Sequence, residues 1–527
     1  MYSGIDDPRR WILQLALEEH ALKRPRQPLV SIIGGESVTF AELNHQVGLV
    51  AGFLQHLGIS AGDRVALLLP NDLDLVRAWL GLGRLGAVAV MINTELSKSF
   101  LAHPLQDSAP RALVIHHSFL DRLEEIATTL PNIRTILVVG ESAGESFQSF
   151  DAWRDAAPTT SALPTAQDPA CIMYTSGTTG APKGVVMPHA HCFLFGLGVV
   201  ENVGLSARDH YYIALPLFHA NGLLMQLGAT IIAGAQATIR PRFSASSWLP
   251  DVQACGATVT NTLGAISAFV IAQPPTSQDR EHRLRLILAA PNLPEHERTW
   301  RQRFGIREVI GAYGMTEVNI PIYGERSKSR PGTCGRVYSK YFDVEIRDPL
   351  TDAPVSKGEV GEIMVRPRIP NGFMSGYFNA PDKTVEAWRN LWFHTGDAGH
   401  VSGDGYITFV DRIKDCIRRR GENISAVDIE TTLAALPGVA EVAAFPVPSE
   451  IDGGEDEIML AIVPSPEVQL TADAIANHAR EHIPRFAWPR YVEFKSSLPK
   501  TGTEKIRKVE LRQAGVTGDT IDLQTYY

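Results

Sequence analysis

Alternating helix and strand patterns run through the first two thirds of the chain. Apolar residues recur at helical spacing from Trp11 to Leu22 and again from Ala41 to about Leu57. Arg64–Pro70 and Ala87–Ile92 contain apolar runs typical of buried strands, and a helix capped near Asp72 follows the first. Further strands are predicted at 112–115, 135–139, 171–174 and 284–290. This alternation predicts an α/β fold with largely parallel sheets.

The pattern changes after about Val337. Short β-like runs, separated by Gly and Asp turns, lie at 343–346, 361–365 and 406–410 and predict a small β subdomain. Beyond Asp411, two helix patterns and two strand patterns follow, at 424–436, 471–482, 439–447 and 458–463. The sequence therefore predicts a large N-terminal domain of parallel α/β sheets with the small β subdomain, residues 1–411, and a smaller α+β C-terminal domain, residues 412–527.

One motif points to a function that its surroundings do not support. Gly81–Gly86 (GLGRLG) matches the dinucleotide-binding fingerprint letter for letter. That fingerprint has to follow a strand and open a helix, whereas this copy closes a predicted helix and precedes a strand. We therefore interpret these glycines as a means of close packing between a helix and a sheet.

Composition and charge narrow the class of protein. A chain of 527 residues is too long for one core, which favours a large domain plus a smaller one. Hydrophobic residues make up 44% of the chain and charged residues 20%, which is an ordinary composition for a globular protein. The net charge of −9 argues against a general nucleic-acid or anionic-membrane binder, so an anionic ligand needs a local site. Five scattered cysteines without a Cys-x-x-Cys pair indicate a reducing compartment and no structural zinc.

Targeting and membrane signals are not recognised. The first ten residues carry acids and arginines without an apolar core, unlike a signal peptide. Residues 211–239 contain no Asp, Glu, Lys or Arg, but Pro216, His219, Asn221 and two glutamines interrupt them, so we expect a buried strand, loop, helix and strand rather than a membrane span. The chain does not end in a peroxisomal signal. A cytoplasmic protein is expected.

The stretch Tyr174–Gly184 (YTSGTTGAPKG) has the composition of a phosphate-binding loop. It follows a predicted strand, its glycines let backbone N–H groups face an anion, and its hydroxyls add donors. Lys183 adds a point charge suited to a phosphate. It is not a Walker A loop, because no Ser or Thr follows the lysine and the glycine spacing differs. The candidate phosphate ligands are Thr175, Ser176, Gly177, Thr178, Thr179, Gly180 and Lys183.

Four further motifs follow this loop in order. They are Tyr313–Glu317 (YGMTE), His394–Asp397 (HTGD), Asp411–Asp415 (DRIKD) and Pro499–Lys505 (PKTGTEK). In this order the five motifs resemble the adenylate-forming superfamily, which comprises acyl- and aryl-CoA synthetases, non-ribosomal adenylation domains and beetle luciferases. The resemblance spans about residues 39–508. It implies an AMP-forming acyl-CoA synthetase that uses ATP, Mg²⁺ and coenzyme A.

The resemblance also implies roles for the residues that contact the nucleotide. The loop holds the β- and γ-phosphates, Thr316 donates to the α-phosphate, and Glu317 binds Mg²⁺, which prefers carboxylates and substrate phosphates. Tyr313 stacks on adenine, with backbone groups from Gly311 and Ala312. Asp397 holds the ribose and Arg412 assists it.

A second group of residues serves the acid, the thiol and the movement between two half-reactions. The resemblance implies that Lys505 bridges the acid carboxylate and the α-phosphate, although Glu504 stands where the family usually has glycine. His219 resembles the gate between acyl pocket and nucleotide. The C-terminal domain turns about a hinge at Lys414, and Gly421 then lets the backbone pass close to the pantetheine arm of CoA.

The chemistry explains why such a site needs cations. A carboxylate has to approach the α-phosphate of ATP, and two unit charges about 4 Å apart repel by about 4 kcal/mol at an effective dielectric near 20. Preorganised donors and cations offset that repulsion. The reaction gives acyl-AMP and pyrophosphate, and CoA thiolate then displaces AMP.

The acid and the acceptor are less well defined. Pocket walls are expected from 219–226, 262–264, 289–291 and 315–318, where Glu317 is the single charged residue, which favours an uncharged acyl tail. The chain looks somewhat like crotonobetaine/carnitine and medium-chain CoA ligases. Transfer to a carrier protein in trans, a luciferase-like oxidation and a catalytically dead nucleotide-binding protein remain as alternatives, and a homodimer is left open. The expected partners are a small carboxylic acid, ATP and CoA, with no nucleic acid and no membrane span.

Overall fold

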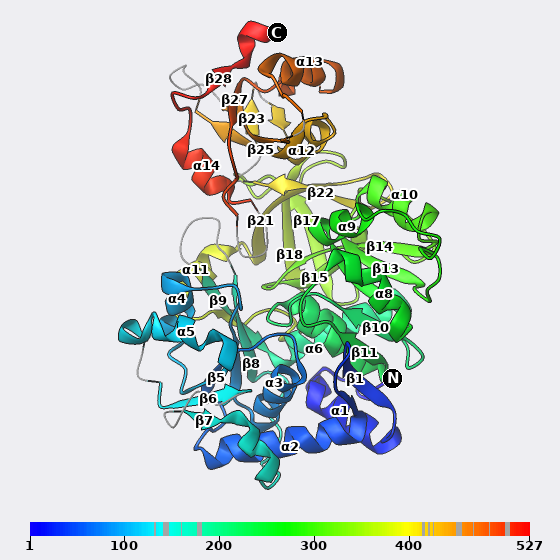
Figure 1. Cartoon of the computed structure of the whole chain (residues 1–527), viewed down its shortest axis with the longest axis vertical. Coiled ribbons are helices and arrows are strands. Elements are labelled where there is room, and N and C mark those ends of the chain that lie inside the picture. Colours follow the sequence, from blue (N-terminus) through cyan, green and yellow to red (C-terminus); the bar gives the residue numbers. More distant parts are fainter. Residues whose placement is uncertain are drawn as a thin grey trace. The chain divides into compact units, whose positions relative to one another are not determined.

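The computed structural model describes residues 1–130, 133–140, 147–159, 161–175, 182–413, 417–419, 422–424, 426–448, 456–466, 468–483, 485–500 and 506–527. The chain divides into two compact units. The first contains Met1–Val344 and Val365–Phe393, and the second contains Glu345–Met364 and His394–Tyr527. Figure 1 labels their helices and strands. No helix among the described residues combines the length and the apolar character that a membrane crossing requires.

The first unit contains a sheet with eight strands among the described residues, in the order β19-β9-β8-β4-β3-β5-β6-β7. Pairings from β8 through β4, β3, β5 and β6 to β7 are parallel, while β9 runs antiparallel to both β8 and β19. The bounds are β3 (Arg64–Leu68), β4 (Val88–Met91), β5 (Ala112–His116), β6 (Thr135–Val139), β7 (Gln148–Ser149), β8 (Pro169–Thr175), β9 (Lys183–Pro188) and β19 (Gly376–Tyr377).

A second sheet of the first unit has nine strands within the described residues, in the order β16-β15-β14-β13-β12-β10-β11-β1-β2. The strands from β14 to β1 are parallel neighbours, and the edges are antiparallel. The bounds are β1 (Pro28–Ile32), β2 (Ser37–Thr39), β10 (His210–Ile213), β11 (Gln236–Ile239), β12 (Val259–Leu263), β13 (Leu286–Ala290), β14 (Glu308–Met315), β15 (Asn319–Tyr323) and β16 (Arg336–Val337).

Helices connect the strands of both sheets, as the alternating pattern predicted. They are α1 (Leu13–Lys23), α2 (Phe40–His56), α3 (Leu73–Leu85), α4 (Lys98–Ser108), α5 (Leu120–Glu124), α6 (His189–Val199), α7 (Ala229–Ala233), α8 (Ala245–Cys255), α9 (Gly264–Ile271), α10 (Pro294–Gln302), α11 (Pro381–Ala387) and the π-helix η6 (Asn221–Gly228).

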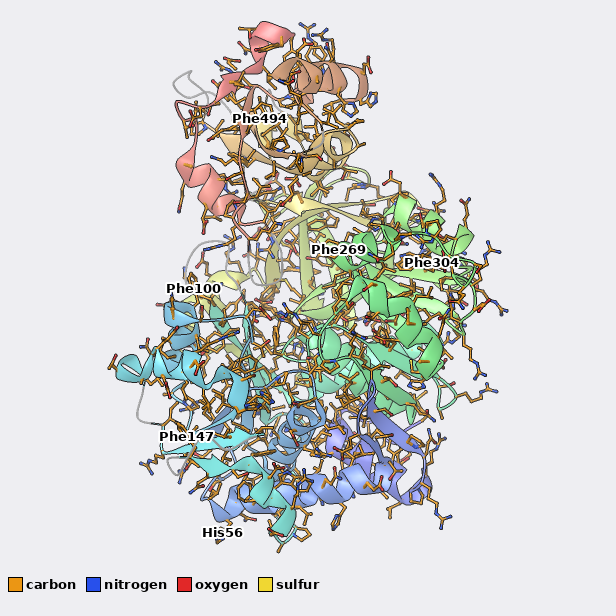
Figure 2. All side chains as sticks on the ribbon, in the orientation of Figure 1. His56, Phe100, Phe147, Phe269, Phe304 and Phe494 are labelled. Carbon is orange, nitrogen blue, oxygen red and sulfur yellow. The ribbon has the colours of Figure 1, made fainter. Side chains whose placement is uncertain are left out.

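Local sequence signals account for several helix ends and packing clusters. Thr39 and Glu42 form a reciprocal capping box at the start of α2, and Asp72 caps α3, as expected. Trp248, Trp300 and Phe304, which is labelled in Figure 2, pack as a buried aromatic cluster between α8 and α10. Aromatic pairs of this kind add packing energy beyond their buried area.

The glycine motif 81–86 lies where its context indicated, at the end of α3 and before β4, with Gly86 in the left-handed region at φ 76°. The expected packing partner was wrong. A Cβ at Gly81 would lie 2.6 Å from Cγ1 of Val50 on α2, and one at Gly83 would lie 2.1 Å from Nε2 of Gln14 on α1. The glycines therefore let α3 approach two other helices, rather than a sheet.

Gly81→Ala is expected to lower the free energy of unfolding by about 1–3 kcal/mol, because its methyl group would overpack the contact with Val50. Gly48→Ala is the matched control. Gly48 lies inside α2, where a Cβ would meet Cβ of Pro158 at an ordinary 3.5 Å, so this change should be neutral or stabilise by up to about 1 kcal/mol. Urea unfolding of both variants measures the difference. Equal stabilities would contradict the packing role of Gly81.

The predicted β subdomain consists of short strands that follow residue 341. The chain passes from one unit to the other within three of them, β17 (Phe342–Arg347), β18 (Gly361–Pro367) and β21 (Trp392–Val401). β20 (Trp388–Arg389) and β22 (Ile407–Arg412) each pair antiparallel with β21. The fold class predicted from the sequence is confirmed, while the boundary predicted at residues 411 and 412 stays a prediction.

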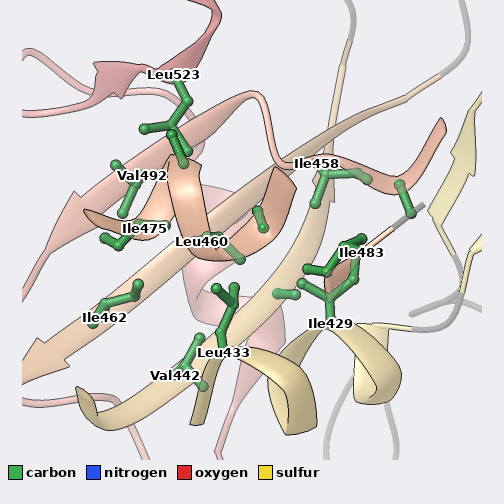
Figure 3. Close-up of a cluster of buried hydrophobic side chains, with 14 of the residues drawn as sticks. Ile429, Leu433, Val442, Ile458, Leu460, Ile462, Ile475, Ile483, Val492 and Leu523 are labelled. Carbon is green, nitrogen blue, oxygen red and sulfur yellow. The ribbon is translucent and has the colours of Figure 1, made fainter. Parts of the chain in front are cut away.

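The C-terminal part of the second unit has its own core. Its four-stranded sheet has the order β25-β26-β27-β28. Figure 3 shows side chains from two helices and this sheet converging, among them Leu433, Leu460, Ile475 and Val492, all fully buried. The elements are α12 (Ala426–Ala434), α13 (Ala472–His482), α14 (Lys508–Ala514), β23 (Ile417–Arg419), β24 (Glu422–Ile424), β25 (Val439–Val447), β26 (Glu457–Pro464), β27 (Tyr491–Phe494) and β28 (Ile521–Asp522).

Candidate active site

The predicted phosphate loop connects two antiparallel strands. Thr175 is the last residue of β8, Lys183 is the first residue of β9, and the two are direct partners across the pair. A Walker A loop instead leads from a strand into a helix. The candidate ligands Ser176, Gly177, Thr178, Thr179 and Gly180 lie outside the described residues, so their roles stay predictions.

Glu317 lies buried beside this strand pair, with 4% of its surface exposed. Oγ1 of Thr175 donates to Oε1 of Glu317 at 3.3 Å, and the hydroxyl of Tyr377 donates to the same oxygen at 3.1 Å. Desolvation raises the pKa of the Glu317 carboxyl, while the hydrogen bond from Tyr377 and the charge of Lys183 act in the opposite direction. The structure thus brings together three of the predicted residues: Thr175, Lys183 and Glu317.

Tyr377 links the lysine to the carboxylate and was not singled out from the sequence. Nζ of Lys183 lies 4.2 Å from the centroid of the Tyr377 ring, a cation–π distance. Tyr377 belongs to β19, which pairs with β9 so that Tyr377 lies opposite Val185. Nearly two hundred residues separate it from Lys183, so the contact depends on the pairing of β9 with β19.

The oxygen chemistry around Glu317 fits a magnesium ion. Both side-chain hydrogen bonds arrive at Oε1, and no other described side chain hydrogen-bonds Oε2. In the described part of the chain there is no group of three or more His, Cys, Asp or Glu residues that could hold a metal. A metal here would depend on one protein carboxylate plus phosphate oxygens and water, which is the usual coordination of Mg²⁺ in ATP-using enzymes.

The turn that carries Thr316 and Glu317 is braced by a buried histidine. His191 on α6 places Nε2 2.8 Å from the carbonyl oxygen of Thr316 and Nδ1 2.8 Å from that of Gly372. Burial lowers the pKa of His191 to about 4, so the neutral ring has one N–H and donates to one of these two carbonyl oxygens. Asn319, with φ 70°, donates from Nδ2 to the His191 carbonyl at 3.0 Å. These contacts fix the backbone that presents Thr316 and Glu317, and neither His191 nor Asn319 was predicted.

Strand β14 supplies the three residues predicted to surround adenine. Ala312 and Tyr313 pair with Tyr323 and Ile322 on β15, and Tyr313 is 9% exposed. Gly311 precedes them, and a Cβ there would lie 2.6 Å from the carbonyl oxygen of Thr333. Gly311 is therefore required for a close backbone approach, in addition to any role at the nucleotide.

His219 lies on a segment that a buried amide holds in place. Asn71, in the loop between β3 and α3, donates from Nδ2 to the Leu215 carbonyl at 3.0 Å and accepts at Oδ1 from the Leu217 amide at 2.8 Å. Asn71 thereby joins loops that follow strands of two different sheets. The His219 ring packs on Phe218 with centroids 4.5 Å apart, and desolvation lowers its pKa to about 4. His219 is therefore neutral between about pH 6 and 8.

The predicted pocket segments lie at one edge of the nine-stranded sheet. β10, β12, β13 and β14 are parallel neighbours, so the segments that follow them leave from the same side. These segments carry His219, Gly264, Pro291 and Glu317, respectively. Ligands of parallel α/β sheets bind beyond the carboxyl ends of the strands, and this edge is such a place.

Two other predicted residues pair within the second unit. Asp397 on β21 is the strand partner of Arg412 on β22, and Nε of Arg412 lies 3.4 Å from Oδ1 of Asp397. Glu362 orders the preceding turn, because it accepts from the Gly396 amide at 2.9 Å and contacts Nδ1 of His394 at 3.0 Å. Glu362 was not predicted from the sequence. Lys414, Gly421 and Lys505, together with Glu504, lie outside the described residues, and their roles stay predictions.

Comparison with known proteins agrees with the motif order. The AMP-binding enzyme family matches residues 17–378, and the AMP-binding enzyme C-terminal domain matches residues 428–505. A crotonobetaine/carnitine–CoA ligase of Escherichia coli O157:H7 (strain EC4115 / EHEC) is 32% identical over 486 residues, which cover 90% of this chain and 93% of that protein.

Solved structures of ligases share the fold over nearly the whole chain. The anthranilate CoA ligase AuaEII in complex with anthranoyl-AMP has a TM-score of 0.86 and 28% identity, covering 97% of this chain and 98% of the other. ATP-bound MatB from Rhodopseudomonas palustris has a TM-score of 0.85 and 26% identity, covering 96% and 98%. The chain belongs to the AMP-binding enzyme family of the adenylate-forming superfamily and is an ATP-dependent, AMP-forming acid–CoA ligase that works through an acyl-adenylate.

Proposed function

We propose that this ligase activates a small carboxylic acid with an uncharged tail, and that Thr175, Lys183, Thr316 and Glu317 form the phosphate side of its active site. The observation that carries the proposal is the contact cluster in which Thr175 and Tyr377 both donate to the buried Glu317 carboxylate while Lys183 stacks on Tyr377. It joins the ends of the phosphate-loop strands to the Tyr313–Glu317 turn. Such a cluster presents an anion ligand and a metal ligand side by side.

In the proposed adenylation step, each group of residues binds a different part of ATP. Lys183 and the loop residues 175–180 bind the β- and γ-phosphates, and Thr316 donates to the α-phosphate. Glu317 holds Mg²⁺, which offsets phosphate charge when it is bound. Tyr313, Gly311 and Ala312 bind adenine, and Asp397 with Arg412 binds the ribose. Because these groups are held before substrate arrives, they oppose charge repulsion without reorganising during the reaction.

Lys505 completes adenylation and then withdraws. We propose that its ammonium bridges the acid carboxylate and the α-phosphate, and that the C-terminal domain, residues 412–527, turns about Lys414 once acyl-AMP has formed. Gly421 then admits the pantetheine arm, and the CoA thiolate attacks the acyl carbon and displaces AMP. Proximity and orientation supply much of the rate in both steps.

The acid is expected to lie at the sheet edge that carries His219, Gly264 and Pro291. A Cβ at Gly264 would lie 3.4 Å from Cδ of Pro291, so glycine leaves room there. Among the segments at this edge, Glu317 is the single charged side chain, which favours an uncharged tail. The relatives named above are called ligases of different acids, and identities of 32% and 28% do not transfer either acid to this chain.

A panel of carboxylic acids tests this proposal. Each acid is incubated with ATP, Mg²⁺ and CoA, and AMP, pyrophosphate and thioester are measured. Neutral-tailed acids should give all three products in equal amounts, whereas dicarboxylic and amino acids of equal length should react at least tenfold more slowly. Preferential use of charged tails would overturn the acid class. Thioester formation on an added carrier protein but not on CoA would identify the alternative acceptor.

Because His219 is neutral near pH 7, a separate prediction follows for the pH dependence of kcat/KM. Because burial lowers its pKa to about 4, its protonation does not change between about pH 6 and 9. His219→Asn should therefore lower kcat/KM for the acid through altered packing and leave the shape of the pH profile unchanged in that range. A wild-type inflection between pH 6 and 7 that disappears in the variant would contradict a neutral gate.

We also propose that the enzyme works in the cytoplasm. The four cysteines that the structure describes, Cys171, Cys192, Cys255 and Cys334, are not in disulfides, which is compatible with a reducing compartment. A homodimer stays a prediction, for which sedimentation is the test.

A further inference from the structure

A chain of hydrogen-bonded amides links the nine-stranded sheet to the start of η6. The hydroxyl of Tyr211 on β10 donates to Oδ1 of Asn261 on β12 at 2.5 Å. Nδ2 of Asn261 donates to Oδ1 of Asn221 at 2.7 Å, and Nε2 of Gln226 donates to the same oxygen at 3.2 Å. Tyr211, Asn261 and Gln226 are all buried. These bonds satisfy the buried polar atoms of Tyr211 and Asn261, while Oε1 of Gln226 has no hydrogen-bond partner among the described residues.

This network fixes which way the Asn221 amide faces. An amide has one oxygen that accepts and one NH₂ group that donates. The Tyr211 hydrogen is committed to Asn261, which turns the NH₂ group of Asn261 toward Asn221. Two donors then meet Oδ1 of Asn221, so its own NH₂ group points out of the network. Among the described residues, that NH₂ group has no hydrogen-bond partner.

Asn221 lies on the acid side of the site. It follows the gate residue His219 by two positions, and its partner Asn261 immediately precedes the segment 262–264 at the same sheet edge. Unlike the other three members of the network, Asn221 is partly exposed. None of the four side chains hydrogen-bonds to the described residues of the cluster around Glu317. Asn221 itself lies in the segment 219–226, which is assigned to the acid pocket.

We propose that Asn221 is a specificity-determining residue whose NH₂ group donates to an oxygen on the tail of the acid. The substrate class is then a carboxylic acid that carries a hydroxyl, carbonyl or ether oxygen on an otherwise uncharged tail. This inference rests on the proposed location of the acid. A hydrocarbon tail would cover a committed donor without satisfying it, and sites built to hydrogen-bond a substrate reject analogues that lack the partner atom.

Matched acids test the preference. Pentanoate is compared with 4-oxopentanoate and 4-hydroxypentanoate, hexanoate with 5-oxohexanoate, and benzoate with its three hydroxy derivatives. The readout is kcat/KM for acid-dependent formation of AMP and thioester. In at least one series, the wild-type enzyme should prefer the oxygen-bearing acid by about 10- to 100-fold. Asn221→Leu should bring that ratio to about one, by lowering kcat/KM for the oxygen-bearing acid and sparing the hydrocarbon acid.

Two neighbouring tyrosines provide a matched pair of variants. Tyr211→Phe removes the hydroxyl that orients the network, so the amides can rotate and the preference should fall severalfold although Tyr211 does not contact the acid. Tyr212→Phe is the control. Tyr212 is equally buried on β10, but its hydroxyl donates to Asp251 at 2.9 Å, outside the network. Tyr212→Phe should leave the preference for oxygen-bearing acids unchanged. If Asn221→Leu fails to fold, Tyr211→Phe still tests the proposal.

The outcomes separate this inference from the function on which it rests. No AMP formation with any acid would count against the proposed acid class. Activity without an oxygen preference in the wild-type enzyme would overturn the role of Asn221. Equal loss for every acid in Asn221→Leu would also overturn it, because the amide would then bind the carboxylate common to all of them. An equal effect of Tyr211→Phe and Tyr212→Phe would exclude orientation by the network.

Discussion

Glu317→Gln should slow formation of acyl-adenylate by a factor on the order of 10²–10³, the loss expected for one preorganised electrostatic contact. Glutamine keeps the shape of the side chain and an oxygen that can accept from Thr175 and Tyr377, but it removes the charge that we propose binds Mg²⁺. Pyrophosphate release in a single turnover, measured with the best acid from the panel, is the readout. The Mg²⁺ concentration for half-maximal rate should rise in parallel.

Tyr377→Phe keeps the Glu317 carboxylate and removes the hydrogen bond that it accepts from the Tyr377 hydroxyl. Loss of one hydrogen bond should cost about tenfold or less at neutral pH. Desolvation already raises the pKa of Glu317, and the Tyr377 hydrogen bond lowers it, so the variant should have a still higher pKa. The ionised form, which we propose binds Mg²⁺, is present above that pKa and is lost as the pH falls. The acid limb of the pH–rate profile should therefore move to higher pH in Tyr377→Phe and be absent from Glu317→Gln.

A contrary result would be easy to recognise. If Glu317→Gln adenylates within threefold of the wild-type rate at every Mg²⁺ concentration, Glu317 is not the metal ligand. Its contacts with Thr175 and Tyr377 would then serve to hold the phosphate-loop strands against the Thr316–Glu317 turn, and a loss of thermal stability should replace the loss of rate.

Lys505→Ala should slow adenylation by on the order of 10²–10³ and spare the second step. The lysine is proposed to neutralise charge between the carboxylate and the α-phosphate, whereas the attack of the CoA thiolate on the acyl carbon is proposed to use another orientation of the C-terminal domain. Thioester formation from supplied acyl-AMP is therefore the matched measurement. Glu504→Gly, which restores the residue usual in the family, is the companion variant and should accelerate adenylation if Glu504 weakens the pull of Lys505.

Equal losses in both half-reactions of Lys505→Ala would contradict a turning C-terminal domain. Retention of both would mean that another cation acts, and Arg507 and Lys508 are the nearest along the chain.

Periodicity predicted elements well where the chain is locally consistent. The strand predicted at 439–447 occupies those residues, and the helix predicted at 471–482 begins after Thr471, whose side chain accepts from the Ala474 amide. The charge-free stretch 211–239 contains β10, η6, α7 and β11, as expected. The packing of α3 was mispredicted because the partner of a glycine is decided by tertiary structure. Val50 and Gln14 are distant in sequence from Gly81 and Gly83, and nothing in the pattern around them indicates that they contact these glycines.

The same distinction applies to the candidate site. The residues proposed to bind ATP and Mg²⁺, such as Thr175, Lys183 and Glu317, lie in motifs that can be recognised in a single sequence. The residues that position these motif residues lie far from them in the sequence, in segments that were not recognised as motifs. Tyr377, His191 and Glu362 acquire their roles from β-pairing and helix packing, which place a hydroxyl, an imidazole or a carboxylate beside the motif. Such positions are visible once a fold is known.

The contacts of Asn71 have a consequence for how this enzyme can change its substrate. Its amide binds the main-chain carbonyl of Leu215 and the main-chain N–H of Leu217, which are groups that almost any amino acid provides. The segment leading to His219 is thus anchored independently of its side chains. If this segment lines the acid pocket as proposed, substitutions along it should change which acid is accepted without losing the anchor, which makes it a suitable target for directed evolution with Asn71 unchanged.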